Sequence, residues 1–241
     1  MKASVQDQNR LIELQRLDSH IQNLEFKLKS LPEIEQLTAI ASRIEVGRKD
    51  LGVAELELGD IQVELKRSEI EVEQVSERIK KDESRLNSGQ GAPKELEQMQ
   101  HELGTLAKRK AELEDGELEI MIRFDTAKAK VDTLKNDEAG LLQLEVELKA
   151  RYEAAFKSLN DEITTEKSKR QTLIPTIDKT LLDLYEKIRG NAGGIGAALL
   201  VGNTCDGCHL SITPIELEKI KSQPDDEVVR CEECRRILVR I

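Results

Sequence analysis

Near the start of the chain, apolar side chains recur at alternating intervals of three and four residues. This spacing lines them along one face of a helix and is typical of a coiled-coil seam. The series runs up to a proline at position 32, where its phase slips. Its members are Leu14, Leu17, Ile21, Leu24, Leu28 and Leu31.

A second seam follows a strict seven-residue repeat beyond the slip, and a run this regular excludes a disordered chain. Its main positions are Leu37, Ile44, Leu51, Leu58, Leu65, Val72, Ile79 and Leu86. The companion positions are smaller or more polar and predict a locally loose pairing: Ile40, Gly47, Ala54, Ile61, Ser68, Val75 and Asp82. Because Pro32 has no backbone N–H, we expect the helix to kink or restart there. Ser30 is the expected N-cap, with Glu33 completing a capping box.

The stretch NSGQGAP at 87–93 ends one long helix and begins another, with Pro93 suited to the first helical turn. Heptads then resume at Met99, Leu106, Leu113, Ile120, Ala127, Leu134, Leu141, Leu148 and Ala155. Two long helices joined by a short loop pack most simply as an antiparallel hairpin. The predicted fold is therefore mainly α, a long antiparallel coiled-coil hairpin followed by a small C-terminal β-rich zinc ribbon.

Pro175 marks a further break, after which residues 176–190 predict a short helix. The glycine-rich stretch at 189–196 predicts a flexible joint rather than a phosphate loop, because no Lys-Ser/Thr ending follows it. The predicted domains are a hairpin arm over 1–190, with its tip near 87–93 and helix breaks near Pro32 and Pro175, and a zinc ribbon over 191–241.

The composition agrees with long helices, since 35% of residues are charged and 2% are aromatic. The formal net charge of −10 gives nucleic-acid binding no support from bulk charge. No stretch approaches the roughly 18 apolar residues of a membrane span. The first ten residues, MKASVQDQNR, also lack the apolar core of a signal peptide. We therefore expect a cytoplasmic protein with no membrane partner.

The cysteines form two C-x-x-C pairs near the C-terminus, Cys205 with Cys208 and Cys231 with Cys234. In a reducing cytosol, paired cysteines more often bind metal than form disulfides. Two intervening residues let one tight turn present both sulfurs to a tetrahedral Zn²⁺. Four thiolates leave no position for water or substrate, so we predict one structural Zn²⁺ rather than a catalytic one.

The segments around the cysteines predict a zinc ribbon with a helical insertion. Residues 197–201 and 235–241 are strand-like, and residues 213–222 are helical. Gly207 is expected to supply the backbone angles that the first cysteine turn requires. His209 is either a bystander or a substitute ligand. A redox role would require a βαβ pattern that the sequence lacks.

Four arginines in the ribbon are candidate nucleic-acid contacts: Arg230, Arg235, Arg236 and Arg240. Alternate residues of a strand share a face, so these side chains could form a basic strip. The other interpretation is an ordinary solvated strand face.

The layout resembles the bacterial coiled-coil and four-cysteine zinc-ribbon family. The resemblance covers essentially the whole chain and includes the tip sequence SGQGAPKELEQMQHEL at 88–103. It implies the same architecture and metal ligands at Cys205, Cys208, Cys231 and Cys234. Members are often labelled as nucleic-acid-binding proteins. Some relatives act as chaperone-like adaptors for an alternative sigma factor or for flagellar or secretion components, or bind a transcript.

Our leading hypothesis is a non-enzymatic adaptor that docks protein partners through its arm and its ribbon. The candidate partner-binding residues at the tip are Lys94, Glu95, Gln98 and His101, whose alternative interpretation is ordinary turn chemistry. The alternative function is RNA or DNA binding through the ribbon. We expect no small-molecule substrate, because no catalytic motif accompanies the three scattered histidines. The heptads are compatible with either a monomer or a dimer, and they do not identify the partner.

Overall fold

The computed structural model describes residues 1–89 and 91–240. Gln90 of the predicted tip and Ile241 of the predicted ribbon lie outside these residues. The chain divides into two compact units, of which unit 1 comprises Met1–Glu35 and Lys149–Ile241, and unit 2 comprises Gln36–Leu148. Residues from both ends of the predicted arm thus belong to the same compact unit as the ribbon. The boundary that the sequence placed at residue 190 is not where the compact units divide.

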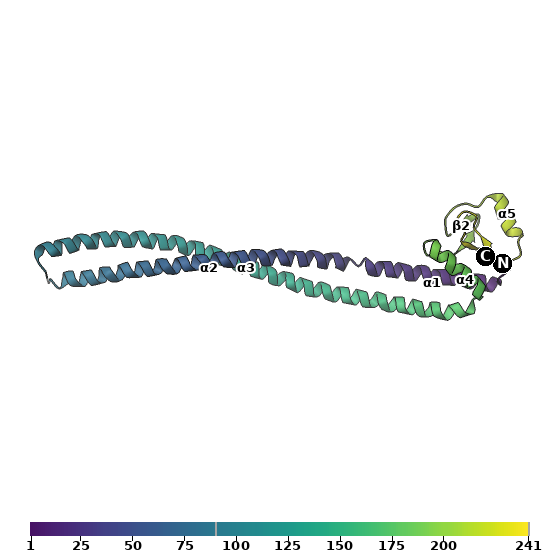
Figure 1. Cartoon of the computed structure of the whole chain (residues 1–241), viewed down its shortest axis with the longest axis horizontal. Coiled ribbons are helices and arrows are strands. Elements are labelled where there is room, and N and C mark those ends of the chain that lie inside the picture. The colour runs from purple at the N-terminus through teal and green to yellow at the C-terminus, as the bar shows by residue number, and fades with distance from the viewer. Residues whose placement is uncertain (90, 241) are drawn as a thin grey trace. The chain divides into compact units, whose positions relative to one another are not determined.

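Unit 2 contains an antiparallel pair of long helices, drawn from α2 (Pro32–Asn87) and α3 (Pro93–Leu173). The two helices lie side by side, and their numbering runs in opposite directions (Figure 1). Ion pairs at successive levels join them: Arg48–Glu138 at 2.7 Å, Lys135–Glu55 at 2.8 Å, Arg123–Glu64 at 3.0 Å and Arg78–Glu102 at 2.5 Å. Exposed pairs of this kind contribute little stability, so they mark the register rather than hold the helices together.

The seam between α2 and α3 is formed by the predicted positions, with one correction. Companion residues Ile40, Ala54 and Ile61 are buried, whereas Leu51 and Leu58 of the main series are only half-buried. A pair of helices has a single contact face, so large side chains at its edge keep part of their surface in water. The companion positions, expected to be the weaker side of the seam, are therefore the more deeply buried ones at these three residues. Ile40 and Ile44 also form a core cluster with Leu148 of α3.

The helix ends coincide with the prolines and glycines of the sequence. α1 (Val5–Lys29) ends just before α2 begins at Pro32, and the short 3₁₀ helix η1 (Ile174–Thr176) contains Pro175. Ser30 does not cap α2 as expected. Its N–H and Oγ both donate to the Phe26 carbonyl, so it caps the C-terminus of α1 instead.

Unit 1 contains a four-stranded sheet in the order β2-β1-β4-β3. The strands are β1 (Ala197–Val201), β2 (Thr204–Cys205), β3 (Val229–Arg230) and β4 (Ile237–Val239). The central strands β1 and β4 are parallel, and the outer strands are antiparallel to their neighbours. The predicted helical insertion is α5 (Pro214–Ser222), and Thr213 caps it by accepting the Glu216 N–H.

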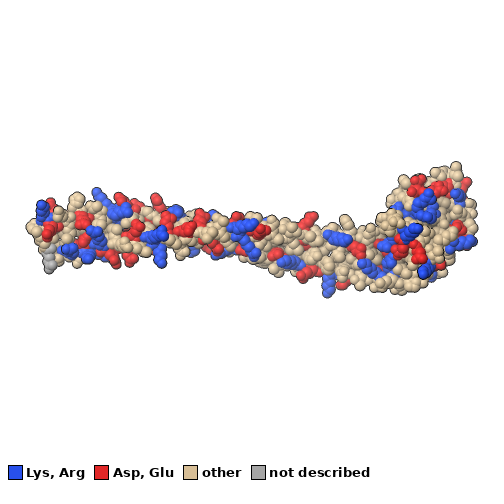
Figure 2. All heavy atoms as spheres, viewed as in Figure 1, with Lys and Arg blue, Asp and Glu red and all other residues tan. Residues whose placement is uncertain are grey.

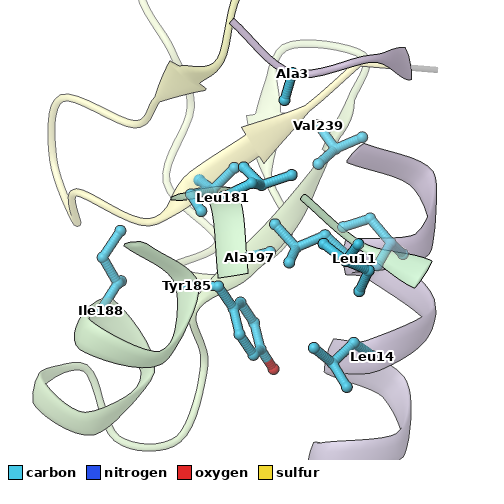
Figure 3. Close-up of a cluster of buried hydrophobic side chains, with 11 residues drawn as sticks. Ala3, Leu11, Leu14, Leu181, Tyr185, Ile188, Ala197 and Val239 are labelled. Atoms are coloured by element: carbon cyan, nitrogen blue, oxygen red, sulfur yellow. The ribbon is translucent and has the colours of Figure 1, made fainter. Parts of the chain in front are cut away.

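One face of this sheet packs against α1 and α4 (Lys179–Asn191). Tyr185 and Leu181 of α4 lie beside Leu11 and Leu14 of α1, with Ala197 of β1 nearby (Figure 3). The complete cluster is Ala3, Leu11, Ile12, Leu14, Ile177, Leu181, Tyr185, Ile188, Ala197, Ile237 and Val239. The ribbon therefore shares a hydrophobic core with helices from both ends of the predicted arm.

Residues 192–196 of the predicted flexible joint at 189–196 form a hydrogen-bonded turn, and residues 189–191 belong to the end of α4. Gln15 of α1 donates to the Gly194 carbonyl at 3.1 Å and accepts the Gly196 N–H at 2.7 Å. At Gly196 a Cβ atom would lie 2.6 Å from the Tyr185 ring, so only glycine fits there. These contacts tie the turn to α1 and α4, which the local glycine content did not reveal.

Within the described residues, none of the helices combines the length and the apolar character needed to cross a lipid bilayer.

Candidate functional site

The four cysteines come together in unit 1. Their sulfur atoms all lie within 4.8 Å of one another, with Cys205 Sγ 3.9 Å from Cys234 Sγ and Cys208 Sγ 3.9 Å from Cys231 Sγ. A tetrahedral Zn²⁺ with Zn–S bonds of about 2.3 Å requires sulfurs roughly 3.8 Å apart. The donor set and its spacing therefore fit a zinc ion.

Two matching turns present these sulfurs. In the first, the His209 N–H donates to the Cys205 carbonyl at 2.7 Å, and the Cys205 N–H donates to the Leu210 carbonyl at 3.1 Å. In the second, Arg235 and Arg236 take the places of His209 and Leu210, with distances to Cys231 of 2.9 and 3.0 Å. His209 and Arg235 both have positive φ, +59° and +63°. The positive φ thus falls on the residue after each pair.

Gly207 has a different role from the one expected. Its φ is not in the left-handed region that favours glycine. A Cβ atom at this position would lie 2.8 Å from the Ala198 Cβ and 2.9 Å from the Arg236 Cδ. Gly207 is therefore required by close packing between the first cysteine turn and β1, not by backbone angles.

Burial and hydrogen bonds shift the pKa values of Cys205, Cys231 and Cys234. Burial raises the pKa of Cys205 to about 12, and burial also raises the pKa of Cys231. Burial alone would raise the pKa of Cys234 too, but hydrogen bonds from the Arg236 backbone and from Cys231 and Cys208 lower it. Metal binding requires the thiolate, so a zinc ion that binds a thiol with a raised pKa displaces its proton to solvent.

The opposite face of the sheet carries the second hydrophobic core of unit 1, which includes Cys205 and Cys231. Its buried members are Ala198, Cys205, Ile212, Ile220, Val229, Cys231 and Leu238. Ile220 belongs to α5, so the helical insertion covers the cysteine side of the sheet. Adjacent residues of β1 and β4 thus serve the helical core on one face and the cysteine core on the other.

The predicted basic strip is divided by hydrogen bonds within the ribbon. Arg236 donates to the carbonyls of Ala192, Ile195 and Gly207 at 2.8 to 3.1 Å. Arg240 donates to the carbonyls of Ile220, Gln223, Pro224 and Glu227 at 2.7 to 2.9 Å. Arg230 and Arg235 are exposed, and Arg230 Nε donates to the Arg235 carbonyl. Arg236 and Arg240 therefore hold loops in place, while Arg230 and Arg235 remain on the surface.

The candidate tip residues lie at the start of α3. Lys94, Glu95, Gln98 and His101 are all exposed. Glu95 accepts the Ala92 N–H at 3.1 Å, which is the capping contact expected three residues into a helix. Glu95 therefore has a local structural role, and the other three present their side chains at the surface.

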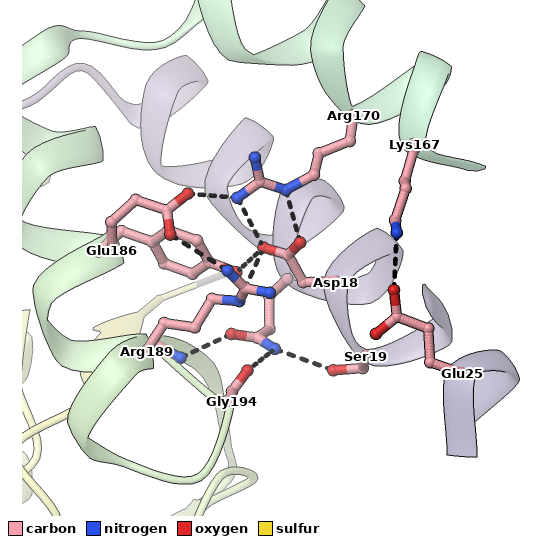
Figure 4. Close-up of polar contacts among 11 residues, drawn as sticks. Asp18, Ser19, Glu25, Lys167, Arg170, Glu186, Arg189 and Gly194 are labelled. Carbon is pink, nitrogen blue, oxygen red and sulfur yellow. Dashed lines mark hydrogen bonds and ion pairs between the residues drawn. The ribbon is translucent and has the colours of Figure 1, made fainter. Parts of the chain in front are cut away.

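A buried ionic cluster in unit 1 was not found from the sequence. Asp18 of α1, 1% exposed, accepts hydrogen bonds from Arg170 Nε at 2.6 Å and from the Tyr185 hydroxyl at 2.7 Å. Arg189 Nε lies 3.2 Å from the same carboxylate, and Glu186 pairs with both arginines (Figure 4). The sequence feature that could have indicated this cluster is a charged residue, Asp18, on the same helical face as Leu14 and Ile21.

Protein-family models match both parts of this chain. The model of the CT398-like coiled coil hairpin domain matches residues 14–193, and that of the C4-type zinc ribbon domain matches residues 204–238. The uncharacterized protein MT2288 of Mycobacterium tuberculosis (strain CDC 1551 / Oshkosh) is 32% identical over 244 residues, which cover 100% of this chain and 98% of that protein.

Solved structures show the same fold. A structure from Mycobacterium smegmatis superposes with a TM-score of 0.82 at 30% identity and covers 100% of both chains. CT398 from Chlamydia trachomatis gives a TM-score of 0.63 at 21% identity over 98% of both chains. At that identity the likeness to CT398 concerns the fold alone. The predicted coiled-coil hairpin and four-cysteine ribbon are confirmed.

Proposed function

This chain belongs to the CT398-like coiled-coil hairpin family, and we propose that it acts as a non-enzymatic adaptor that docks protein partners. The observation that carries the proposal is the surface of unit 2. α2 and α3 use one face each for their mutual seam and leave large apolar side chains in solvent, among them Leu56, Val53 and Ile122. Exposed apolar rows on paired helices are typical of surfaces that receive other helices.

The chemistry of the described residues supports a binding role over an enzymatic one. Among residues 1–89 and 91–240, the cluster of metal-ligating groups is the four-cysteine set, and four thiolates complete a tetrahedral sphere. The carboxylate of Asp18 is engaged by two arginines and a tyrosine of unit 1. Neither cluster offers an open position to a substrate.

Zinc has a structural role in this proposal. Cys205, Cys208, Cys231 and Cys234 hold one Zn²⁺, which neutralises part of the thiolate charge and links the two turns. Because the sheet carries a core on each face, the metal also supports the packing of α1 and α4. Metal analysis of the purified chain should give one zinc per molecule, and the double variant C208S/C231S should give none.

Affinity capture tests the adaptor role. Zinc-loaded protein is used to capture partners from native extract, and half of each sample is treated with nuclease. A small set of proteins that survives nuclease supports an adaptor. Bound material that is mainly ribosomal or chromosomal and disappears with nuclease would instead support the RNA or DNA alternative through Arg230 and Arg235.

A tip variant tests which part of the arm docks. K94A/Q98A/H101A removes the exposed polar groups and keeps Glu95, whose contact with Ala92 caps α3. Loss of captured partners with an unchanged helical signal supports docking through the tip. Unchanged capture removes the tip from the docking surface. The matched control is K108A/K128A on the same helix, outside the tip.

A further inference from the structure

α2 carries a second apolar row on its solvent side. The row consists of Val46, Val53, Leu56, Val63 and Ile70, all exposed, from 45% for Ile70 to 74% for Leu56. We call this set the outer row. Its residues are distinct from the buried seam residues Ile40, Ile44, Ala54 and Ile61 of the same helix.

The outer row has the spacing of a coiled-coil seam. Its members are separated by seven, three, seven and seven residues, and Lys49, Asp60 and Arg67 occupy the remaining positions of the same three-four series. A series of this kind receives the side chains of another helix between its own. From Val46 to Ile70 it extends about 36 Å along α2, enough for a partner helix of roughly 25 residues.

Two glycines lie on one flank of the outer row, at positions where packing within this chain does not require glycine. Gly52 and Gly59 are exposed, are spaced by one heptad, and a Cβ atom at either would meet nothing within 4 Å. Glycine in a helix interior is about 1 kcal/mol less favourable than alanine. Packing within unit 2 does not require glycine at either position, and the missing side chains leave room for a helix beside the outer row.

The charges on the two flanks of the outer row indicate which kind of helix binds there. On one flank, each heptad contributes an exposed acid: Asp50, Glu57, Glu64 and Glu71. Glu57 and Glu64 pair with Lys130 and Arg123 of α3, which partly compensates their charge, whereas within the described residues no ion pair engages Asp50 or Glu71. On the other flank stand Glu45, Gly52, Gly59, Lys66 and Glu73. Figure 2 shows charges of both signs interspersed over the helices, so this bias belongs to the flanks of the row rather than to a uniformly acidic surface.

We infer that the outer row binds an amphipathic helix of a partner protein whose flanks are basic. The inference rests on the proposed adaptor function and specifies its docking surface and partner chemistry. A second copy of this chain fits poorly. Antiparallel self-pairing sets the acidic flank against itself, and parallel self-pairing offers it Lys66 as a single cation.

Peptides of defined sequence test the inference on the full zinc-loaded chain. Two 28-residue peptides share Val and Leu at the seam positions and differ only at the flanks, which are Lys in one and Glu in the other. We expect the Lys peptide to bind at least about tenfold more tightly than the Glu peptide, a difference of about 1.4 kcal/mol. Its affinity should fall with added salt, because the flanking charges are exposed. Equal binding of the two peptides, or no binding, overturns the inference.

Matched variants locate the binding surface. L56Q/V63Q alters the outer row, and L118Q/V146Q alters equally exposed residues of α3. Both should keep the helical signal of the wild type, and only the first should lose the Lys peptide. G52A/G59A should raise the thermal stability of the helices while weakening the peptide complex, because the added methyl groups fill the space left for the partner. Peptide binding that survives L56Q/V63Q overturns the inference.

Light scattering and affinity capture separate the remaining outcomes. If the wild type is a dimer and L56Q/V63Q is a monomer, the outer row binds a second copy of this chain. That result overturns the inference. Nuclease-resistant partners that L56Q/V63Q still captures leave the adaptor function standing without this surface. If neither form captures any protein, the adaptor function itself fails, whatever the peptides show.

Discussion

Asp18 concentrates several interactions in one buried side chain. Arg170 and Tyr185 donate to its carboxylate, and Arg189 lies 3.2 Å away. Replacing the carboxylate by an amide leaves the arginines without their shared anion, which typically costs 3 to 5 kcal/mol for a buried pair. We expect D18N to destabilise unit 1 by about 3 kcal/mol, measured by urea unfolding. E13Q, an exposed neighbour on α1, is the control, and equal midpoints for D18N and wild type would contradict the prediction.

Tyr185 makes the stability of unit 1 depend on pH. Burial and the hydrogen bond to Asp18 raise the pKa of its hydroxyl above the ordinary value of 10.0. The folded chain then keeps a proton that the unfolded chain releases, so this contribution is complete below about pH 10 and is lost as the pH rises further. Unfolding midpoints should therefore fall as the pH rises above about 10 in wild type and in Y152F. Y185F should show a smaller fall, and an identical fall in all three proteins would refute the assignment.

Gly207 lies where the first cysteine turn packs closely against β1. A methyl group there meets Ala198 and Arg236 at distances below 3.0 Å, so either β1 or the turn must move. Overpacking of this kind typically costs 1 to 3 kcal/mol. We expect G207A to release zinc to a chelator faster than wild type. G190A, in α4 where a Cβ meets nothing within 4 Å, should release zinc at the wild-type rate. Equal rates for all three proteins would count against the packing argument.

At the scale of elements, the sheet depends on helices that are distant in sequence. One face of β1 and β4 is covered by α1 and α4, through residues such as Leu11, Leu14 and Tyr185. Residues 191–241 alone would expose Ala197, Ile237 and Val239 to water. We therefore expect this fragment, even with zinc, to give poorly dispersed NMR spectra, whereas the full chain protects the amides of β1 and β4 from exchange. A well-dispersed spectrum of the zinc-loaded fragment would show that the predicted domain folds alone.

The same elements show what a sequence can and cannot reveal. The seam of α2 and α3 and the C-x-x-C pairs depend on spacing within a short stretch of chain, so periodicity and ligand geometry suffice to predict them. The contacts of Gln15, Asp18 and Arg236 join residues that are far apart in the chain. Their partners follow only from the packing of α1 and α4 on the sheet. That packing is also why the glycine-rich stretch at 189–196, which ends α4 and then turns, is not the predicted joint.

At the scale of the whole molecule, the two units should respond differently to loss of metal. Chelation removes the link between the two cysteine turns and weakens the core on that face of the sheet. The other face carries Tyr185, so its ring should become accessible to acrylamide. The seam of unit 2 is formed by α2 and α3 themselves, through residues such as Ile40, Ile44 and Leu148. Most of the helical signal should therefore survive chelation.

A Y152F background, in which Tyr185 is the remaining tyrosine, makes this prediction measurable in a single sample. Fluorescence quenching follows unit 1, while circular dichroism at 222 nm follows the helices and is dominated by the long pair. C208S/C231S in the same background should match the chelated protein without chelator, because it lacks two of the four ligands. Zinc added back should restore protection in the chelated protein and not in the variant. If chelation abolishes the helical signal as well, the hairpin depends on the metal, and the structural role of zinc extends beyond the unit that binds it.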